Sequence, residues 1–226
     1  YGNHVGSWNF AATAYLNRWK VKIYYEHYFD DHSQMFFQYG RWKDGHIGLE
    51  ITFPKKRFID TFVYEGLGTK DQTGPMLYDS FWGKFEEQIS AKDNYYNHYL
   101  YQGWQHWGMG IGNPLLPGPI YNKNGQITFI SNRVLAHHIG FCGSPCQSLS
   151  YRMLLSYSRH WGTYDNPLNE IKKQFNSLFE VTYAPQQLKG WSFTVSGAMD
   201  RGSILGNNYG GMLVIRKQGI IKSGNK

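Results

Sequence analysis

Aromatic residues recur at a fixed distance along three stretches of this chain in which apolar and polar side chains alternate. The pairs lie eight or ten positions apart and are Trp19 and Phe29, Tyr151 and Trp161, and Phe175 and Tyr183. A strand rises about 3.3 Å per residue, so ten residues tilted by about 40° cover about 25 Å along a membrane normal. That is the height of an outer-membrane apolar band, which aromatic girdles flank. The spacing therefore predicts strands that cross a bilayer.

The alternation itself has a period of two, as a half-buried strand requires. From Trp19 to Phe29 the odd positions are mostly apolar, while the even positions include Lys20, Lys22 and Glu26. Comparable runs lie at 8–16, 47–53, 151–161, 175–183 and 191–199, and less regular ones near 58–66, 133–142 and 209–221. We therefore predict an all-β, antiparallel, up-and-down transmembrane barrel, of which this chain supplies nine or ten strands as part of a larger barrel.

A large soluble sheet protein is the alternative, because its strands also alternate where one face packs on a core. Strands of soluble sandwiches usually run about five or six residues, whereas several runs here keep their alternation for nine to eleven. That length suits a tilted membrane strand. Strand length thus favours a transmembrane barrel over a soluble sheet protein.

Composition fits one domain, 1–226, with a polar average and many aromatic side chains. Of the 226 residues 41% are hydrophobic and 18% aromatic, and the mean hydropathy is −0.53. No run of 18 apolar residues occurs, so a transmembrane helix is excluded. The net charge of +7 is scattered, which argues against nucleic acid as a partner. These cations either lie in solvated loops and the lumen or attract anionic polysaccharide or outer-leaflet phosphates.

The sequence predicts neither a cofactor nor a metal ion. Cys142 and Cys146 lack the second pair that a structural zinc needs, so we expect a short-loop disulfide or free thiols. His137 and His138 are adjacent on a strand and point to opposite faces, so they do not share a metal. The chain begins at Tyr1 without Met, and we expect any export signal to have been removed or to lie upstream.

An insertion at about 78–130 interrupts the strands. Phe81, Phe85 and Ile89 have helical spacing there, and residues 94–122 contain no Asp, Glu, Lys or Arg. Aromatic faces and amide or imidazole groups are what sugars bind, so we expect this loop or plug to frame a glycan surface. The tentative glycan-binding residues are Asn97, His98, Tyr99, Tyr101, Gln102, Trp104, Gln105 and Trp107. The alternative is that the tryptophans pack the loop onto the barrel and that Asn97 and His98 cap backbone groups.

Several ordered motifs resemble the capsule assembly Wzi family of outer-membrane proteins, in its Bacteroides-type version. They run from Tyr64-Glu65 and 69–75 through 97–104 and 110–114 to 132–134 and 136–140. The residues that carry the resemblance include Glu65, Gln72, Gly74, Gly103, Asn132, Arg133 and His137. Family members are about twice as long, so this chain resembles their C-terminal half.

The resemblance implies a closed, plugged barrel of about eighteen strands in the bacterial outer membrane. It implies a lectin-like role, without catalysis, in anchoring capsular polysaccharide or exopolysaccharide to the cell surface. Outer-membrane lipid and surface polysaccharide would then be the partners, and other envelope proteins remain open as partners. The C-terminal run ends without the terminal aromatic that many such barrels carry, so we expect a missing or atypical end.

Two further function classes remain open. An outer-membrane porin or channel would line open water with its polar faces, including Lys20, Glu50, Arg152 and Glu180. An outer-membrane hydrolase would need a serine beside a histidine, and Ser156, Ser158 and His160 share one strand face. Because side chains at i and i+2 start about 7 Å apart, we expect no direct hydrogen bond between them.

Overall fold

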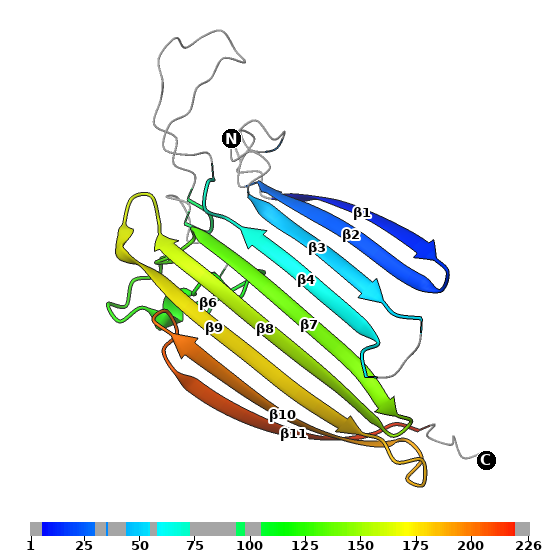
Figure 1. The fold of residues 1–226 in the computed structure, drawn as a ribbon. Coiled ribbons are helices and arrows are strands. Elements are labelled where there is room, and N and C mark those ends of the chain that lie inside the picture. The colour runs from blue at the N-terminus through cyan, green and yellow to red at the C-terminus, as the bar shows by residue number, and fades with distance from the viewer. Residues whose placement is uncertain are drawn as a thin grey trace, which may run out of the picture.

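The computed structural model shows, among the residues it describes, one large antiparallel sheet of nine strands in meander order and a separate two-stranded sheet (Figure 1). It describes residues 6–29, 35, 44–54, 58–72, 94–97 and 105–219. The strands are β1 (Gly6–Leu16), β2 (Trp19–Phe29), β3 (Gly45–Thr52), β4 (Thr61–Gly68), β7 (Val134–Cys146), β8 (Leu149–Gly162), β9 (Pro167–Tyr183), β10 (Trp191–Gly202) and β11 (Asn208–Lys217). The predicted all-β, antiparallel class is confirmed, and the described residues supply nine of the nine or ten strands predicted for the sheet.

The alternation in sequence separates the sheet into two faces that keep their character across all nine strands. The register aligns even positions of β8 with even positions of β7 and β9, so each face runs unbroken across strand boundaries. We call the polar face the side of Glu26, Glu65, His138, Ser156 and Asn176. We call the apolar face the opposite side, which carries the predicted aromatic pairs.

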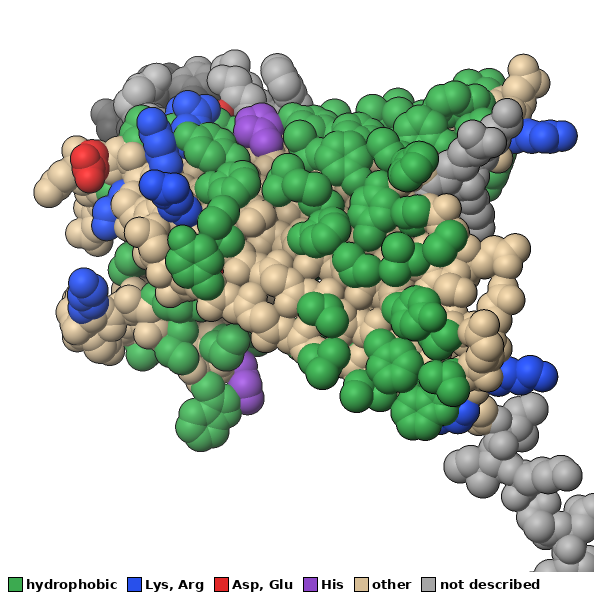
Figure 2. Space-filling view, turned by 60° about the horizontal axis from the view of Figure 1, so that its bottom comes forward, with side chains coloured by type: hydrophobic (Ala, Val, Ile, Leu, Met, Phe, Trp, Pro, Cys, Tyr) green, Lys and Arg blue, Asp and Glu red, His purple; other side chains and the backbone are tan. Residues whose placement is uncertain are grey.

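In the described part of the chain, the apolar face carries many exposed large side chains. Its exposed large side chains include Trp8, Phe10, Ile23, Ile47, Phe179, Val195, Tyr209 and Leu213, between 42% and 80% exposed. Figure 2 shows hydrophobic side chains spread over the sheet surface. Within the described part of the chain, no second sheet packs on this face, so the sandwich arrangement of the soluble alternative is absent there.

Closure into a barrel is not seen among the described residues. The sheet starts at β1 and ends at β11, and each pairs with one neighbour, β2 and β10 respectively. The nine strands curve, but the two edge strands do not meet (Figure 1). The described part of the chain is therefore an open sheet, and closure of the larger barrel to which it was predicted to belong stays a prediction.

The two ends of the sheet differ in the length of their connections. One end, the turn end, has the two-residue turns 17–18 and 147–148 together with connections 53–60 and 184–190. Asn17 and Arg18 both have positive φ, as a type I′ hairpin turn requires. The other end, the insertion end, carries connections 30–44, 69–133, 163–166 and 203–207.

The long connection between β4 and β7 runs from 69 to 133, wider than the predicted 78–130. Its described parts include β5 (Gln105–His106), β6 (Met109–Gly110) and the 3₁₀ helix η2 (Pro119–Tyr121). This insertion packs on the polar face through a buried apolar cluster of Leu67, Leu116, Phe129, Val134 and Ala136. The predicted helical spacing from Phe81 to Ile89 lies outside the described residues.

Candidate binding cavity on the polar face

A cavity of about 880 Å³ lies between the polar face and the insertion. The sheet supplies a wall of hydrogen-bonding groups, among them Glu26, His46, Glu65, His138, Ser156, Gln174 and Asn176. The facing segments supply apolar groups, among them Tyr96, Pro114, Leu115, Leu116 and Leu205. A volume within the range of small-molecule sites and two walls of opposite character suit a ligand with both apolar and hydroxyl-bearing surfaces.

The polar wall is organised as a row that crosses the sheet strand by strand. The register places Glu65 opposite His138, His138 opposite Ser156, and Ser156 opposite Asn176. Neighbours pair within this row: His138 Nδ1 lies 2.7 Å from Ser156 Oγ, and Asn176 Nδ2 donates to Asp200 Oδ1 at 2.6 Å. A polar side chain therefore recurs at each strand from β4 to β10, about every 4.8 Å.

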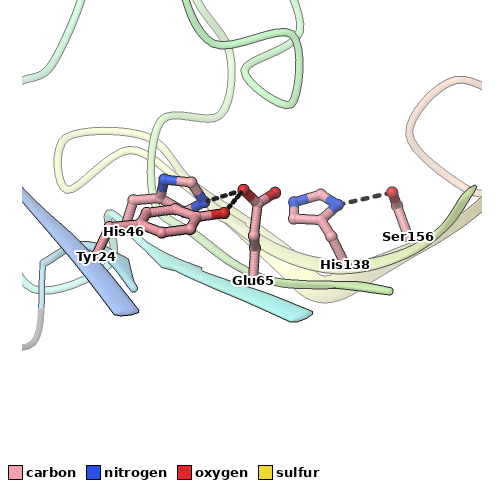
Figure 3. Close-up of polar contacts among 5 residues, drawn as sticks. All are labelled: Tyr24, His46, Glu65, His138 and Ser156. Carbon is pink, nitrogen blue, oxygen red and sulfur yellow. Dashed lines mark hydrogen bonds and ion pairs between the residues drawn. The ribbon is translucent and has the colours of Figure 1, made fainter. Parts of the chain in front are cut away.

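Glu65 is held at one end of this row by two partners from β2 and β3. The Tyr24 hydroxyl donates to Glu65 Oε1, and His46 Nε2 lies 3.5 Å from the same oxygen (Figure 3). Gly48 makes the first contact possible, because it lies between Tyr24 and Glu65 in the register. A Cβ at Gly48 would overlap the Tyr24 ring, so only glycine lets the ring cross β3.

Two serine hydroxyls contact His160 on β8, and the first of these contacts corrects the distance predicted for the hydrolase alternative. Ser158 Oγ lies 2.9 Å from His160 Nε2, although the residues are two positions apart on one strand. The reach of the imidazole bridges the gap between the two Cβ atoms. His160 Nδ1 lies 3.4 Å from Ser131 Oγ, so both ring nitrogens face hydroxyl groups.

A buried polar network ties the base of the insertion to the sheet. The Asp44 carboxylate, 1% exposed, accepts hydrogen bonds from the backbone N–H groups of Asp71 and Gln72 and from the Tyr95 hydroxyl. Burial raises the pKa of the Asp44 carboxyl to about 6, because desolvation of the charged form outweighs these hydrogen bonds. Asp44 thus links the segment before β3 with 71–72 and 94–97.

Asn132 and Arg133, singled out by the resemblance, belong to the same base. Asn132 Nδ2 donates to Asn94 Oδ1 at 2.5 Å and to the Tyr95 carbonyl at 2.9 Å, and Gln72 Nε2 donates to Asn132 Oδ1 at 3.2 Å. Arg133 Nε donates to the Lys70 carbonyl at 3.1 Å, and its guanidinium carbon lies 3.9 Å from the centre of the Tyr164 ring. These contacts join loops to the sheet.

The other residues of the resemblance are spread across both faces. Glu65 lines the cavity, whereas His137 lies on the apolar face with its Nδ1 2.8 Å from the Tyr64 hydroxyl. His137 and His138 thus point to opposite faces, as predicted. Gly74 and Gly103 lie outside the described residues.

Three of the eight predicted glycan-binding residues are described, and their settings differ. Asn97 clamps the backbone of Phe129, accepting from its N–H and donating to its carbonyl, both at 2.7 Å. Gln105 Oε1 accepts from the Gly108 N–H at 2.8 Å and braces the β5–β6 hairpin. Trp107 stands at the hairpin tip, 86% exposed. His98, Tyr99, Tyr101, Gln102 and Trp104 lie outside the described residues.

Among the described candidates, Trp107 therefore has an indole ring that a ligand can reach. The side-chain amide of Asn97 is already hydrogen-bonded to the Phe129 backbone. Residues of the polar row that the sequence did not single out, such as Tyr24, Gln174, Asn176 and Asp200, form or flank the cavity wall. For Tyr24 and Asn176 the only signal in the sequence is an even position within an alternating run, and Gln174 and Asp200 lie one position outside such runs.

Both cysteines are free, Cys142 half-buried on β7 and Cys146 exposed. Within the described residues, no group of three or more His, Cys, Asp or Glu side chains is placed to hold a metal ion. In the same ranges, no helix has the length and apolar character to cross a membrane.

Comparison with protein-family models, curated proteins and solved structures gave no match to this chain.

Proposed function

We propose that this chain forms part of the wall of a bacterial outer-membrane β-barrel, together with an insertion inside that barrel. The barrel would hold capsular or surface polysaccharide at the cell surface. The observation that carries this proposal is the single-layer sheet with an exposed apolar face on one side and a cavity-bearing polar face on the other. Lipid would cover the first face, and the second would face an enclosed interior. Polysaccharide is proposed as the ligand because the sequence motifs resemble the Wzi family.

The two ends of the sheet suggest the orientation of the chain. Outer-membrane barrels have short periplasmic turns and longer extracellular loops. The turn end would therefore face the periplasm, and the insertion end would face the exterior, where a surface polysaccharide arrives. Trp107 and the cavity both belong to the insertion end.

We propose a binding role without catalysis. His160 has hydroxyl groups at both ring nitrogens, and neither is the carboxylate or amide that orients a catalytic histidine in a serine hydrolase. The second pair, Ser156 and His138, has Glu65 opposite it in the register, but the described bonds of that carboxylate go to Tyr24 and His46. We expect a fluorophosphonate probe, which labels activated serines, to leave the protein unlabelled. Labelling that is lost on Ser158→Ala or Ser156→Ala would favour the hydrolase instead.

Binding of purified capsular polysaccharide from the organism that carries the gene tests the polysaccharide role. Trp107→Ala removes an exposed aromatic surface of the kind that stacks on sugars, and we expect it to weaken binding at least about tenfold. Tyr209→Ala is the matched control, because Tyr209 is 80% exposed but lies on the apolar face. Equal affinity of the wild type and Trp107→Ala, with both folded, would contradict a role of the hairpin in binding.

A further inference from the structure

Four cations gather at the insertion end of the apolar face. Arg159 on β8 and Lys173 on β9 are directly opposite each other in the register, and Arg201 on β10 lies opposite Phe175, two positions along β9 from Lys173. Lys70 joins them through Trp161, whose ring centre lies 5.1 Å from Lys70 Nζ and 5.4 Å from the Arg159 guanidinium carbon. Figure 2 shows Lys and Arg side chains collected at the left end of the hydrophobic surface.

The basic cluster is defined as Lys70, Arg159, Lys173 and Arg201, and among the described residues no ion pair reaches these four cations. Ion pairs within the described residues join Lys20 to Glu50, His46 to Glu65 and Arg152 to Glu180, all on the polar face. None of them includes a member of the basic cluster. Like charges directly opposite on neighbouring strands destabilise a sheet, so the Arg159–Lys173 pair is stabilised if an anion lies over it.

The position of the cluster suggests which anion that is. Its members lie at the boundary of the apolar face, beside the aromatic Trp161, where a lipid-facing Arg or Lys costs far less than at the bilayer centre. Lipid phosphate groups lie at that depth. Guanidinium groups bind phosphate through two parallel hydrogen bonds, and an ammonium adds a point charge.

We infer that the basic cluster binds the phosphate groups of an anionic lipid in the outer leaflet. The inference rests on the membrane part of the proposed function and deepens it by naming a lipid partner. In the proposed orientation the insertion end faces outward, so the lipid would be a phosphorylated glycolipid of the lipid A kind. The cluster would then fix the depth and rotation of the sheet in the membrane.

Titration of the purified protein in detergent micelles with bisphosphorylated lipid A tests the inference. Arg159→Gln, Lys173→Gln and Arg201→Gln combined should weaken binding about 100-fold, because each basic residue near a charged headgroup contributes about fivefold. A control triple variant, Lys20→Gln, Lys22→Gln and Arg152→Gln, removes the same charge from the polar face and should change the affinity less than threefold. Lipid A without phosphates should bind all three proteins weakly and equally.

Inorganic phosphate, offered without lipid, separates the headgroup from the free ion. We expect no saturable binding of inorganic phosphate at concentrations up to about 10 mM, because a shallow cluster on an exposed face lacks the enclosure of a free-anion site. Saturable binding of the ion alone, or equal lipid A affinity of the wild type and the cluster triple variant, would overturn the inference.

Insertion into vesicles of phosphatidylcholine alone distinguishes failure of this inference from failure of the proposed function. Protease protection should show the wild type and the cluster triple variant inserting to the same extent, since the apolar face is intact in both. A wild type that does not insert would remove the membrane proposal together with the lipid site. Normal insertion with no preference for phosphorylated lipid A would remove the lipid site alone.

Discussion

Gly48 allows the Tyr24 side chain on β2 to cross β3 and contact Glu65 on β4. Any side chain at this position would occupy the space of the Tyr24 ring, which bonds to Glu65 on the far side. Gly48→Ala should therefore lower the free energy of unfolding by about 1 to 3 kcal/mol through overpacking. Urea titration in vesicles measures this change.

Gly210→Ala is the matched control for that substitution. Gly210 also lies in a strand of the sheet, and a Cβ there would have no heavy atom within 4 Å. We expect it to alter the free energy of unfolding by less than about 1 kcal/mol. Equal effects of the two substitutions would show that the Tyr24 ring does not cross the glycine.

Asp44 should make the stability of the fold depend on pH in an unusual direction. Because its folded pKa of about 6 lies above the ordinary value, 3.8, the folded state binds more protons between these limits. The free energy of unfolding contributed by Asp44 is therefore highest below about pH 4 and falls as the pH rises to about 6, by at most about 3 kcal/mol.

Comparison with Asp44→Asn isolates that contribution, because the amide does not titrate. The difference in free energy of unfolding between the wild type and Asp44→Asn should shift in favour of the wild type as the pH falls from 7 to 4. A difference that stays constant over this range, or shifts the other way, would show that the buried carboxyl keeps an ordinary or lowered pKa.

At the level of strands, the sequence pattern predicted most of the sheet because burial on one face leaves a period of two. The run from Trp19 to Phe29 coincides with β2, and the run from 191 to 199 covers most of β10. In β9 the pattern revealed only 175–183, although the strand begins at Pro167. Asn169 and Lys173 interrupt the apolar alternation there, while pairing with β8 maintains the strand.

The candidate site was less predictable than the strands, for a physical reason. Its row depends on the register between strands that are far apart in sequence: Glu65 and His138 meet only because β4 pairs with β7 across the insertion. Asn97 was predicted to bind glycan, but its side chain is hydrogen-bonded to the Phe129 backbone. An amide can bond a sugar hydroxyl or a backbone group equally well. Residue type alone does not distinguish the two uses.

The two faces of β10 should respond differently to a charge when the sheet is in a bilayer. Val195 is exposed on the apolar face in the middle part of β10, so Val195→Arg should lower the free energy of unfolding in vesicles by about 2 to 4 kcal/mol. Ala198→Arg places the same charge on the polar face of the same strand and should cost less than about 1 kcal/mol. Equal and small costs would indicate that water bathes both faces.

For the whole molecule, the position of the insertion separates a plugged barrel from an open channel. The insertion packs on the polar face through Leu116 and Phe129, which places it where a pore would run. We therefore expect few and small conductance steps in a planar bilayer, and larger steps after residues 105–128 are replaced by a short Gly-Ser linker. Large steady channels from the intact protein would instead support the porin alternative.

Solvent accessibility along β9 tests the assignment of the two faces most directly. Cysteine substitutions at 178, 179, 180 and 181, in a background with Cys142→Ser and Cys146→Ser, can carry a nitroxide label in vesicles. Paramagnetic relaxation should show positions 179 and 181 accessible to oxygen dissolved in lipid, and 178 and 180 accessible to a water-soluble nickel chelate. Nickel access at 179 and 181 equal to that at 178 and 180 would mean that the apolar face does not face lipid.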